Sequence, residues 1–172
     1  MAMTSVYRAL LELGTLSANH AGHDGRPARA RERGGGAMRA TDLMNAEPRT
    51  IDIDATIAEA LEAFDVSGQR VLPVLSEGRV VGLLCSRDVR RMLGGLAAAS
   101  ERTLGVVLSL PISDFHAAEG RTVFPEMNVR AVLRRIMDEQ LPELPVVARK
   151  TGALLGLITS ERVLAAAREG WV

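Results

Sequence analysis

The sequence predicts a mixed α/β fold of the α+β kind, built from two copies of a β-α-β-β-α unit that pack about a pseudo-two-fold axis. The first observation is a repeated pair of segments: 71–74 (VLPV) and 81–89 (VGLLCSRDV) recur as 143–146 (ELPV) and 155–163 (LGLITSERV). The second is a nearly constant offset. Pro73 and Pro145 are 72 positions apart (145 − 73), and Gly82 and Gly156 are 74 apart (156 − 82). We attribute the two-residue difference to a hairpin turn, where length varies freely.

The offset of 72 also extends toward the N-terminus. It relates Asp42 to Asp114 (114 − 42) and Thr50 to Thr122 (122 − 50). Chance similarity between two apolar segments would not keep one offset through a lead-in, a strand, a helix and a second strand. Any ligand site should therefore exist in two versions, and the residues that differ between them are evidence about function.

Capping residues and apolar spacing mark the helices of each copy. Thr56 followed by Glu59 has the spacing of a capping box, and Gly68 is a typical helix end. Asn128 can cap the corresponding helix of the second copy, and Ser86 opens the second helix of the first. The expected extended segments are 50–51, 71–75, 79–84, 144–147 and 153–158, each short and rich in apolar residues.

The remaining segments divide the chain into a lead segment (1–37), repeat 1 (38–98), a connection (99–111) and repeat 2 (112–172). Residues 96–110 are rich in Ala and Leu, which predicts a helix that either extends the preceding helix or is a separate one. Residues 1–37 predict a short N-terminal helix followed by a flexible Gly- and Arg-rich linker. That helix could bind a protein partner. The linker arginines could bind an anionic partner, but Asp24 and Glu32 interrupt them, so we favour a solvated linker.

Composition excludes several classes of protein. The 172 residues carry 21 basic and 21 acidic side chains, and only 3% are aromatic, which argues against a nucleic-acid-binding protein. Apolar runs are too short for membrane insertion, and we expect no secretory signal. One cysteine, Cys85, fits a reducing compartment, so we expect a cytoplasmic protein.

The order of these motifs resembles the CBS domain family, and their repetition resembles a CBS pair, or Bateman module. The resemblance rests on the Leu-Pro-Val strand, the Gly-hydrophobic-hydrophobic strand end, and an Asp three residues after it. It covers residues 38–168 and includes the lead-in Asp42-Leu43-Met44. It implies two repeats packed sheet to sheet, two clefts between them, association into a homodimer, and a regulatory function. The ligands it implies are adenosine compounds such as AMP, ADP or ATP, and no catalytic cofactor.

In the first copy, the resemblance assigns the ligand site to Thr50, Ile51, Arg70, Val71, Leu72, Pro73, Cys85 and Asp88, with Ser86 and Arg87 nearby. In the family, a Thr or Ser at the strand end contacts phosphate and the Asp accepts from the ribose hydroxyls. Cys85 replaces that hydroxyl residue, and a thiol is a weak donor. Phosphate contact would then depend on Ser86, on the helix N–H groups, and on Arg87 or Arg70 for charge.

In the second copy, the corresponding positions are Thr122, Val123, Glu143, Leu144, Pro145, Thr159, Ser160 and Arg162. Thr159 keeps the hydroxyl, but Arg162 stands where the first copy has Asp88. An arginine cannot accept hydrogen bonds from a diol, although it could bind a phosphate or lie in solvent. Each copy thus holds half of the usual pair. We expect at most one cleft to bind a nucleotide in the family manner, and favour the one with Asp88.

Two alternatives stay open. The pair could be a ligand-free structural module that dimerises or binds a partner, or Cys85 could sense redox state, although a single buried cysteine is more often a small apolar residue. His20, His23 and Asp24 lie close together in the sequence but in a segment expected to be flexible. His116 occupies the position in the second copy that Met44 has in the first. We therefore expect no metal site. We expect no enzyme activity, because no nucleophile and base, Walker loop or Rossmann fingerprint is present.

Overall fold

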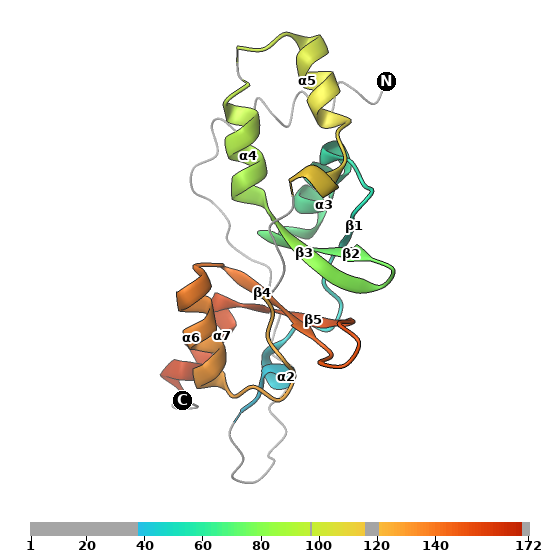
Figure 1. Ribbon diagram of the computed structural model, residues 1–172. Coiled ribbons are helices and arrows are strands. Elements are labelled where there is room, and N and C mark those ends of the chain that lie inside the picture. The colour runs from blue at the N-terminus through green and yellow to red at the C-terminus, as the bar shows by residue number, and fades with distance from the viewer. Residues whose placement is uncertain (1–37, 97, 116–120, 170–172) are drawn as a thin grey trace. The chain divides into compact units, whose positions relative to one another are not determined.

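Strands and helices follow one another in the predicted order (Figure 1). The computed structural model describes residues 38–96, 98–115 and 121–169, which all belong to one compact unit spanning 37–172. The elements are α2 (Ala40–Leu43), β1 (Ile51–Asp52), α3 (Ile57–Ser67), β2 (Val71–Ser76), β3 (Arg79–Cys85), α4 (Ser86–Gly94), α5 (Glu101–Leu108), the 3-10 helix η1 (Ile112–Asp114), α6 (Val129–Glu139), β4 (Glu143–Val147), β5 (Leu154–Thr159) and α7 (Ser160–Arg168). The predicted N-terminal helix and linker lie outside the described residues.

The strands of repeat 1 form a three-stranded sheet with the order β1-β2-β3. β1 runs parallel to β2 with Ile51 opposite Val74, and β2 pairs antiparallel with β3. The capping box at the start of α3 is confirmed, because the Glu59 amide donates to Thr56 Oγ1 (3.3 Å) and the Thr56 amide donates to Glu59 Oε2 (2.7 Å). Gly68 ends the helix in a left-handed conformation, as predicted.

Repeat 2 repeats this plan with a two-stranded sheet, β4-β5. A single parallel bridge between Val123 and Val146 replaces the β1 pairing of repeat 1. Asn128 caps α6 as predicted, with Oδ1 accepting from the Ala131 amide at 2.9 Å. The connection forms a separate helix, α5, whose first turn is capped by Ser100, so the second of the two alternatives for residues 96–110 is correct.

The lead-in of each copy packs against the other copy. The Ala40 amide donates to the Met127 carbonyl, and the Ile112 amide donates to the Ala55 carbonyl, both at 2.8 Å. These bonds are equivalent, because 112 − 40 and 127 − 55 are both 72. Figure 1 accordingly shows α2 beside α6 and α7. The offset found in the sequence therefore describes a reciprocal exchange of segments about the pseudo-two-fold axis.

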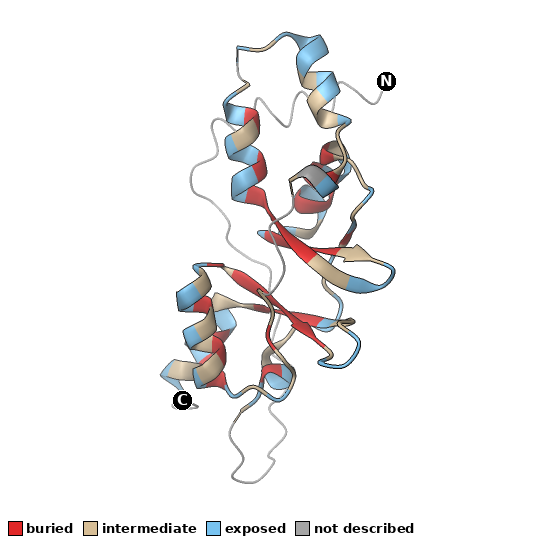
Figure 2. Cartoon of the chain, in the orientation of Figure 1, coloured by how far each residue is buried: buried red, intermediate tan, exposed pale blue. Residues whose placement is uncertain are grey.

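The two sheets share one apolar core. Val71, Leu83 and Cys85 of repeat 1 belong to the same buried cluster as Leu144, Ile158 and most of the apolar face of α6. Figure 2 shows the buried segments concentrated on the strands and on the helix faces that cover them. The hairpins are also joined, because Arg79 Nε donates to the Thr151 carbonyl (2.8 Å) and the Val80 amide to the Gly152 carbonyl (3.1 Å).

The ends of α3 and α6 offer a matched test of backbone strain. Gln140 ends α6 with φ 52°, where the equivalent residue of repeat 1 is Gly68 with φ 67° (140 − 68 is 72). A side chain disfavours this left-handed conformation. We expect Gln140→Gly to raise the free energy of unfolding by about 0.5–1 kcal/mol and Gly68→Ala to lower it by a similar amount. Urea unfolding of both variants checks this, and equal signs would contradict it.

Candidate functional site

A cleft of about 620 Å³ lies where the start of α4 faces the end of α6. It is lined by residues of both repeats: Arg70, Cys85, Ser86, Arg87, Ile136, Met137, Gln140, Leu141 and Pro142. Four of these, Arg70, Cys85, Ser86 and Arg87, were predicted site residues of the first copy. The structure brings them together and places them against the end of α6 in the second copy.

Hydrogen bonds fix the backbone on the repeat 1 side of the cleft. The Ser86 amide donates to the Arg70 carbonyl at 3.0 Å, which ties the start of α4 to the residue before β2. The equivalent bond in repeat 2 joins the Ser160 amide to the Pro142 carbonyl at 2.8 Å. Both versions of the site therefore have the same framework, and the side chains decide how they differ.

The first difference is the helix cap. Thr159 caps α7, with Oγ1 accepting from the Arg162 amide at 3.3 Å, whereas Cys85 makes no side-chain cap for α4. The amides in the first turn of α4 therefore lack the hydroxyl acceptor that α7 has. N–H groups at a helix start attract anions. Because Cys85 has a thiol in place of the hydroxyl, the N–H groups at the start of α4 can bind another acceptor, such as an anion.

Cys85 itself is 7% exposed and packs in the shared core. Burial raises the pKa of its thiol, and the charge of Asp88 raises it further, while Arg87 and Arg121 act in the opposite direction. A thiol held in its neutral form is a poor nucleophile. The side chain therefore acts mainly as an apolar wall of the cleft.

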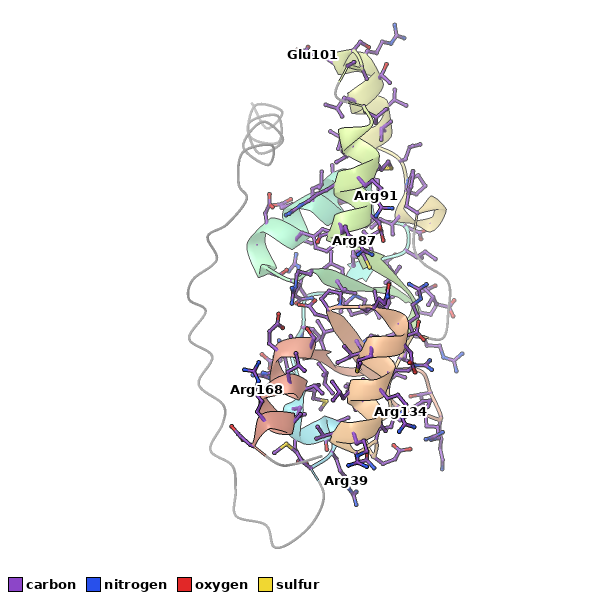
Figure 3. All side chains as sticks on the ribbon, turned by 90° about the vertical axis from the view of Figure 1, so that its left-hand side faces the viewer. Arg39, Arg87, Arg91, Glu101, Arg134 and Arg168 are labelled. Carbon is purple, nitrogen blue, oxygen red and sulfur yellow. The ribbon has the colours of Figure 1, made fainter. Side chains whose placement is uncertain are left out.

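Asp88 lies on the exposed side of the first turn of α4, next to the cleft and outside its lining. The Arg87 guanidinium lies close to it, with Nε 3.7 Å from Asp88 Oδ1. Figure 3 shows Arg87 at the start of α4 and Arg91 one turn further along the helix. Asp88 is thus accessible to a ligand that extends out of the cleft.

In the second copy, the corresponding side chains already have partners within the protein. Arg162 Nη1 donates to the Leu43 carbonyl at 3.1 Å, which holds the end of α2 against α7. Glu161 of repeat 2 forms an ion pair with Arg70 of repeat 1. Thr159 is used by the helix cap. Arg162 is exposed, as one of its two suggested roles requires, and its bond to Leu43 is a contact that neither role included.

Glu143 lies at the junction of the two repeats. Its Oε2 accepts from the amides of Val71 (2.9 Å) and Arg70 (3.1 Å), and the side chain is buried. Burial raises the pKa of this carboxyl, against the effect of the two backbone hydrogen bonds. Glu143 was predicted beside the base of a ligand in the second copy, and the structure places it as a clamp between β2 and β4.

The other predicted site residues contribute elsewhere. Most form the strands and are buried: Ile51, Val71, Leu72, Pro73, Val123, Leu144 and Pro145. Thr50 precedes β1 and is partly buried. Thr122 lines a second, smaller pocket of about 220 Å³, together with Arg121, Phe124, Arg149 and both hairpins. There the Arg149 guanidinium lies 3.9 Å from the centre of the Phe124 ring and pairs with Glu126.

Sequence reasoning missed the repeat 2 side of the cleft, which consists of Ile136, Met137, Gln140, Leu141 and Pro142. One signal could have indicated it. Residues at equal repeat positions meet near a two-fold axis, so Arg70 and Pro142 (142 − 70 is 72) should lie at the same junction. Arg121 was also missed, although its charge acts on Cys85 and its Nε lies 3.4 Å from Glu139 Oε2.

Among the described residues, no group of three His, Cys, Asp or Glu side chains could hold a metal ion. His20, His23, Asp24 and His116 lie outside the described residues. In the same part of the chain, no helix has the length and apolar character that crossing a membrane requires.

Two stretches of the chain, 40–95 and 111–169, each match the CBS domain family. The chain belongs to the CBS domain family. Its two CBS domains correspond to the two repeats, and CBS pairs are generally regulatory modules rather than catalytic ones.

Solved CBS structures share the fold. A putative archaeal homologue of g-AMPK from Methanocaldococcus jannaschii superposes with a TM-score of 0.68 and 19% identity over 76% of this chain, which spans about half (48%) of that one. The CBS domain pair of protein MJ0100, in complex with 5′-methylthioadenosine and S-adenosyl-L-methionine, has a TM-score of 0.64 and 19% identity over 78% of this chain and 99% of that one. CBSX2 in complex with AMP has a TM-score of 0.63 and 19% identity over 76% and 96%.

Proposed function

We propose that this CBS pair is a regulatory module that binds an adenine nucleotide of the AMP, ADP or ATP type in the cleft between α4 and α6. The observation that carries the proposal is the cleft itself. Its volume of about 620 Å³ is within the range of small-molecule sites, and it joins an apolar wall to two arginines and a helix start without a side-chain cap.

Each part of a nucleotide has a suitable partner. Ile136, Leu141 and Pro142 provide an apolar surface for adenine. Arg70 and Arg87 can bind phosphate oxygens in a planar, bidentate manner, and the amides that begin α4 add N–H donors. Asp88 can accept both hydroxyl hydrogens of a ribose. The arginines favour anionic nucleotides over the cationic S-adenosylmethionine.

The signal would be a change in packing. The cleft has one wall from each repeat, so a ligand that contacts both walls alters how the repeats fit together. In a homodimer, which the family resemblance implies, such a change would alter the geometry between subunits. Support for an adenosine ligand comes from the solved CBS structures that contain AMP, or 5′-methylthioadenosine and S-adenosyl-L-methionine. A cytoplasmic location would supply the nucleotide.

Calorimetric titration tests the proposal on protein first shown to be free of bound nucleotide. We expect saturable binding of AMP, ADP or ATP, and about tenfold weaker binding to Asp88→Ala, because a hydrogen bond to a charged group is worth about 1.5 kcal/mol or more. The matched control is Asp65→Ala, which deletes an exposed carboxylate on α3. Absence of binding by all three nucleotides would overturn the proposal.

The alternative is a ligand-free module for dimerisation or partner binding. It is favoured by α5, an eight-residue helix with no buried residue, which leaves Val106 58% exposed. The same titration discriminates between the two functions, since the structural module would bind none of the nucleotides.

A further inference from the structure

The Arg70–Glu161 ion pair connects the cleft to the other repeat. We propose that Glu161 is an intramolecular competitor for the phosphate group of the ligand. In the empty protein, its carboxylate holds the Arg70 guanidinium, and an anionic ligand must displace it. The inference rests on the proposed function, because it describes how occupancy of that same cleft is regulated.

The backbone around Arg70 leaves the side chain as the part that can move. The Arg70 amide donates to Glu143 Oε2 at 3.1 Å, and the Arg70 carbonyl accepts from the Ser86 amide at 3.0 Å. Both partners are fixed, one in the buried junction and the other at the start of α4. The side chain is 50% exposed, lines the cleft and pairs with Glu161, which is 63% exposed at the start of α7.

The energies favour displacement by a ligand. An ion pair between two half-exposed side chains contributes little, because water screens it and both side chains lose freedom. A guanidinium with a phosphate forms a stronger, bidentate pair. Glu161 therefore weakens the binding of an anionic ligand without preventing it.

Among the described residues, this ion pair forms on only one side of the pseudo-two-fold axis. The residue equivalent to Glu161 is Arg87 (161 − 87 is 74), and the residue equivalent to Arg70 is Pro142 (142 − 70 is 72). Proline has no charge with which to hold Arg87, so the equivalent contact cannot form. Arg70 thus belongs to both versions of the site, and moving it toward a ligand releases the start of α7 in the other repeat.

Titration of ATP and of uncharged adenosine into four proteins tests the inference: wild type, Glu161→Gln, Arg70→Gln and the double variant. We expect Glu161→Gln to bind ATP about two- to fivefold more tightly, which corresponds to the contribution of an exposed ion pair, and adenosine with unchanged affinity. Glu161→Gln should have no further effect when Arg70 is already glutamine. Glu126→Gln, which removes the Glu126–Arg149 pair outside the cleft, is the matched control and should leave ATP affinity unchanged.

Two results would overturn the inference in distinguishable ways. If the wild type binds ATP and Glu161→Gln binds it equally, or gains affinity equally with and without Arg70, the competition fails while the nucleotide site stands. If none of the four proteins binds either compound, the competition and the proposed function fail together.

Discussion

Replacing Glu143 with alanine is expected to lower the free energy of unfolding by about 3 kcal/mol. One carboxylate oxygen accepts from the amides of Arg70 and Val71, and Val71 is fully buried. Alanine removes the acceptor from the Val71 N–H group, where water has little access, and from the Arg70 N–H group, which is partly buried. Hydrogen bonds to a charged group are worth more than neutral ones, so the loss should exceed that of an ordinary polar contact.

The position of Glu143 explains why the effect should be global. It begins β4, and its partners precede and begin β2, so the contact joins the two repeats directly. Val71 is also the residue of repeat 1 that is equivalent to Glu143 (143 − 71 is 72). Urea unfolding of Glu143→Ala measures the loss, with Glu62→Ala on the exposed face of α3 as the control, expected to change stability by less than about 0.5 kcal/mol. A loss below about 1 kcal/mol for Glu143→Ala would contradict the clamp.

The same residue should make stability depend on pH in a defined direction. Burial raises the pKa of Glu143 above the ordinary value of 4.5, so between 4.5 and the folded-state pKa the folded protein binds more protons than the unfolded one. The part of its contribution that depends on proton binding is therefore fully present below pH 4.5 and is lost as pH rises through the folded-state pKa. The glutamine of the Glu143→Gln variant has no carboxyl group to ionise, so that variant lacks this pH dependence. The stability of the wild type relative to Glu143→Gln should fall as pH rises from 4.5 through the folded-state pKa, and a constant difference would contradict it.

The elements of the fold could be predicted because their signals are local. The capping box of Thr56 and Glu59, the Asn128 cap and the helix end at Gly68 each depend on residues a few positions apart. The repeated motifs then placed both hairpins. The exchange of lead-ins was not visible, since the offset of 72 is the same whether a lead-in packs on its own copy or on the other.

One wall of the candidate cleft could be predicted and the other could not, for a related reason. The side of the cleft that contains Arg70, Cys85, Ser86 and Arg87 follows from the motif at the start of α4. The opposite wall comes from the end of α6 in the other repeat, and a motif contains no information about which distant segment faces it. Arg162 shows the same limit, because its partner is the Leu43 carbonyl, 119 positions away in the sequence.

Gly156→Ala tests the exchanged packing directly and is expected to cost about 2–3 kcal/mol. A Cβ atom at this position would lie 2.5 Å from the Asn45 carbonyl oxygen and 2.8 Å from Met44 Sδ. The methionine side chain can move, but the backbone oxygen cannot move without disturbing the reciprocal 2.8 Å hydrogen bonds between Asn45 and Leu157. A methyl group must therefore push the lead-in of repeat 1 away from β5.

The matched control is Gly105→Ala, at an exposed position of α5 with no atom within 4 Å of the added Cβ, which should raise stability by up to about 1 kcal/mol through helix propensity. Opposite signs for two identical substitutions would locate the cost of Gly156→Ala in the close approach to the lead-in. Hydrogen exchange adds a local readout, because the Asn45 and Leu157 amides should exchange faster in Gly156→Ala than in Gly105→Ala. If Gly156→Ala leaves both stability and exchange unchanged, the lead-in does not pack on β5, and the contact between Arg162 and Leu43 at the end of α2 loses its basis as well.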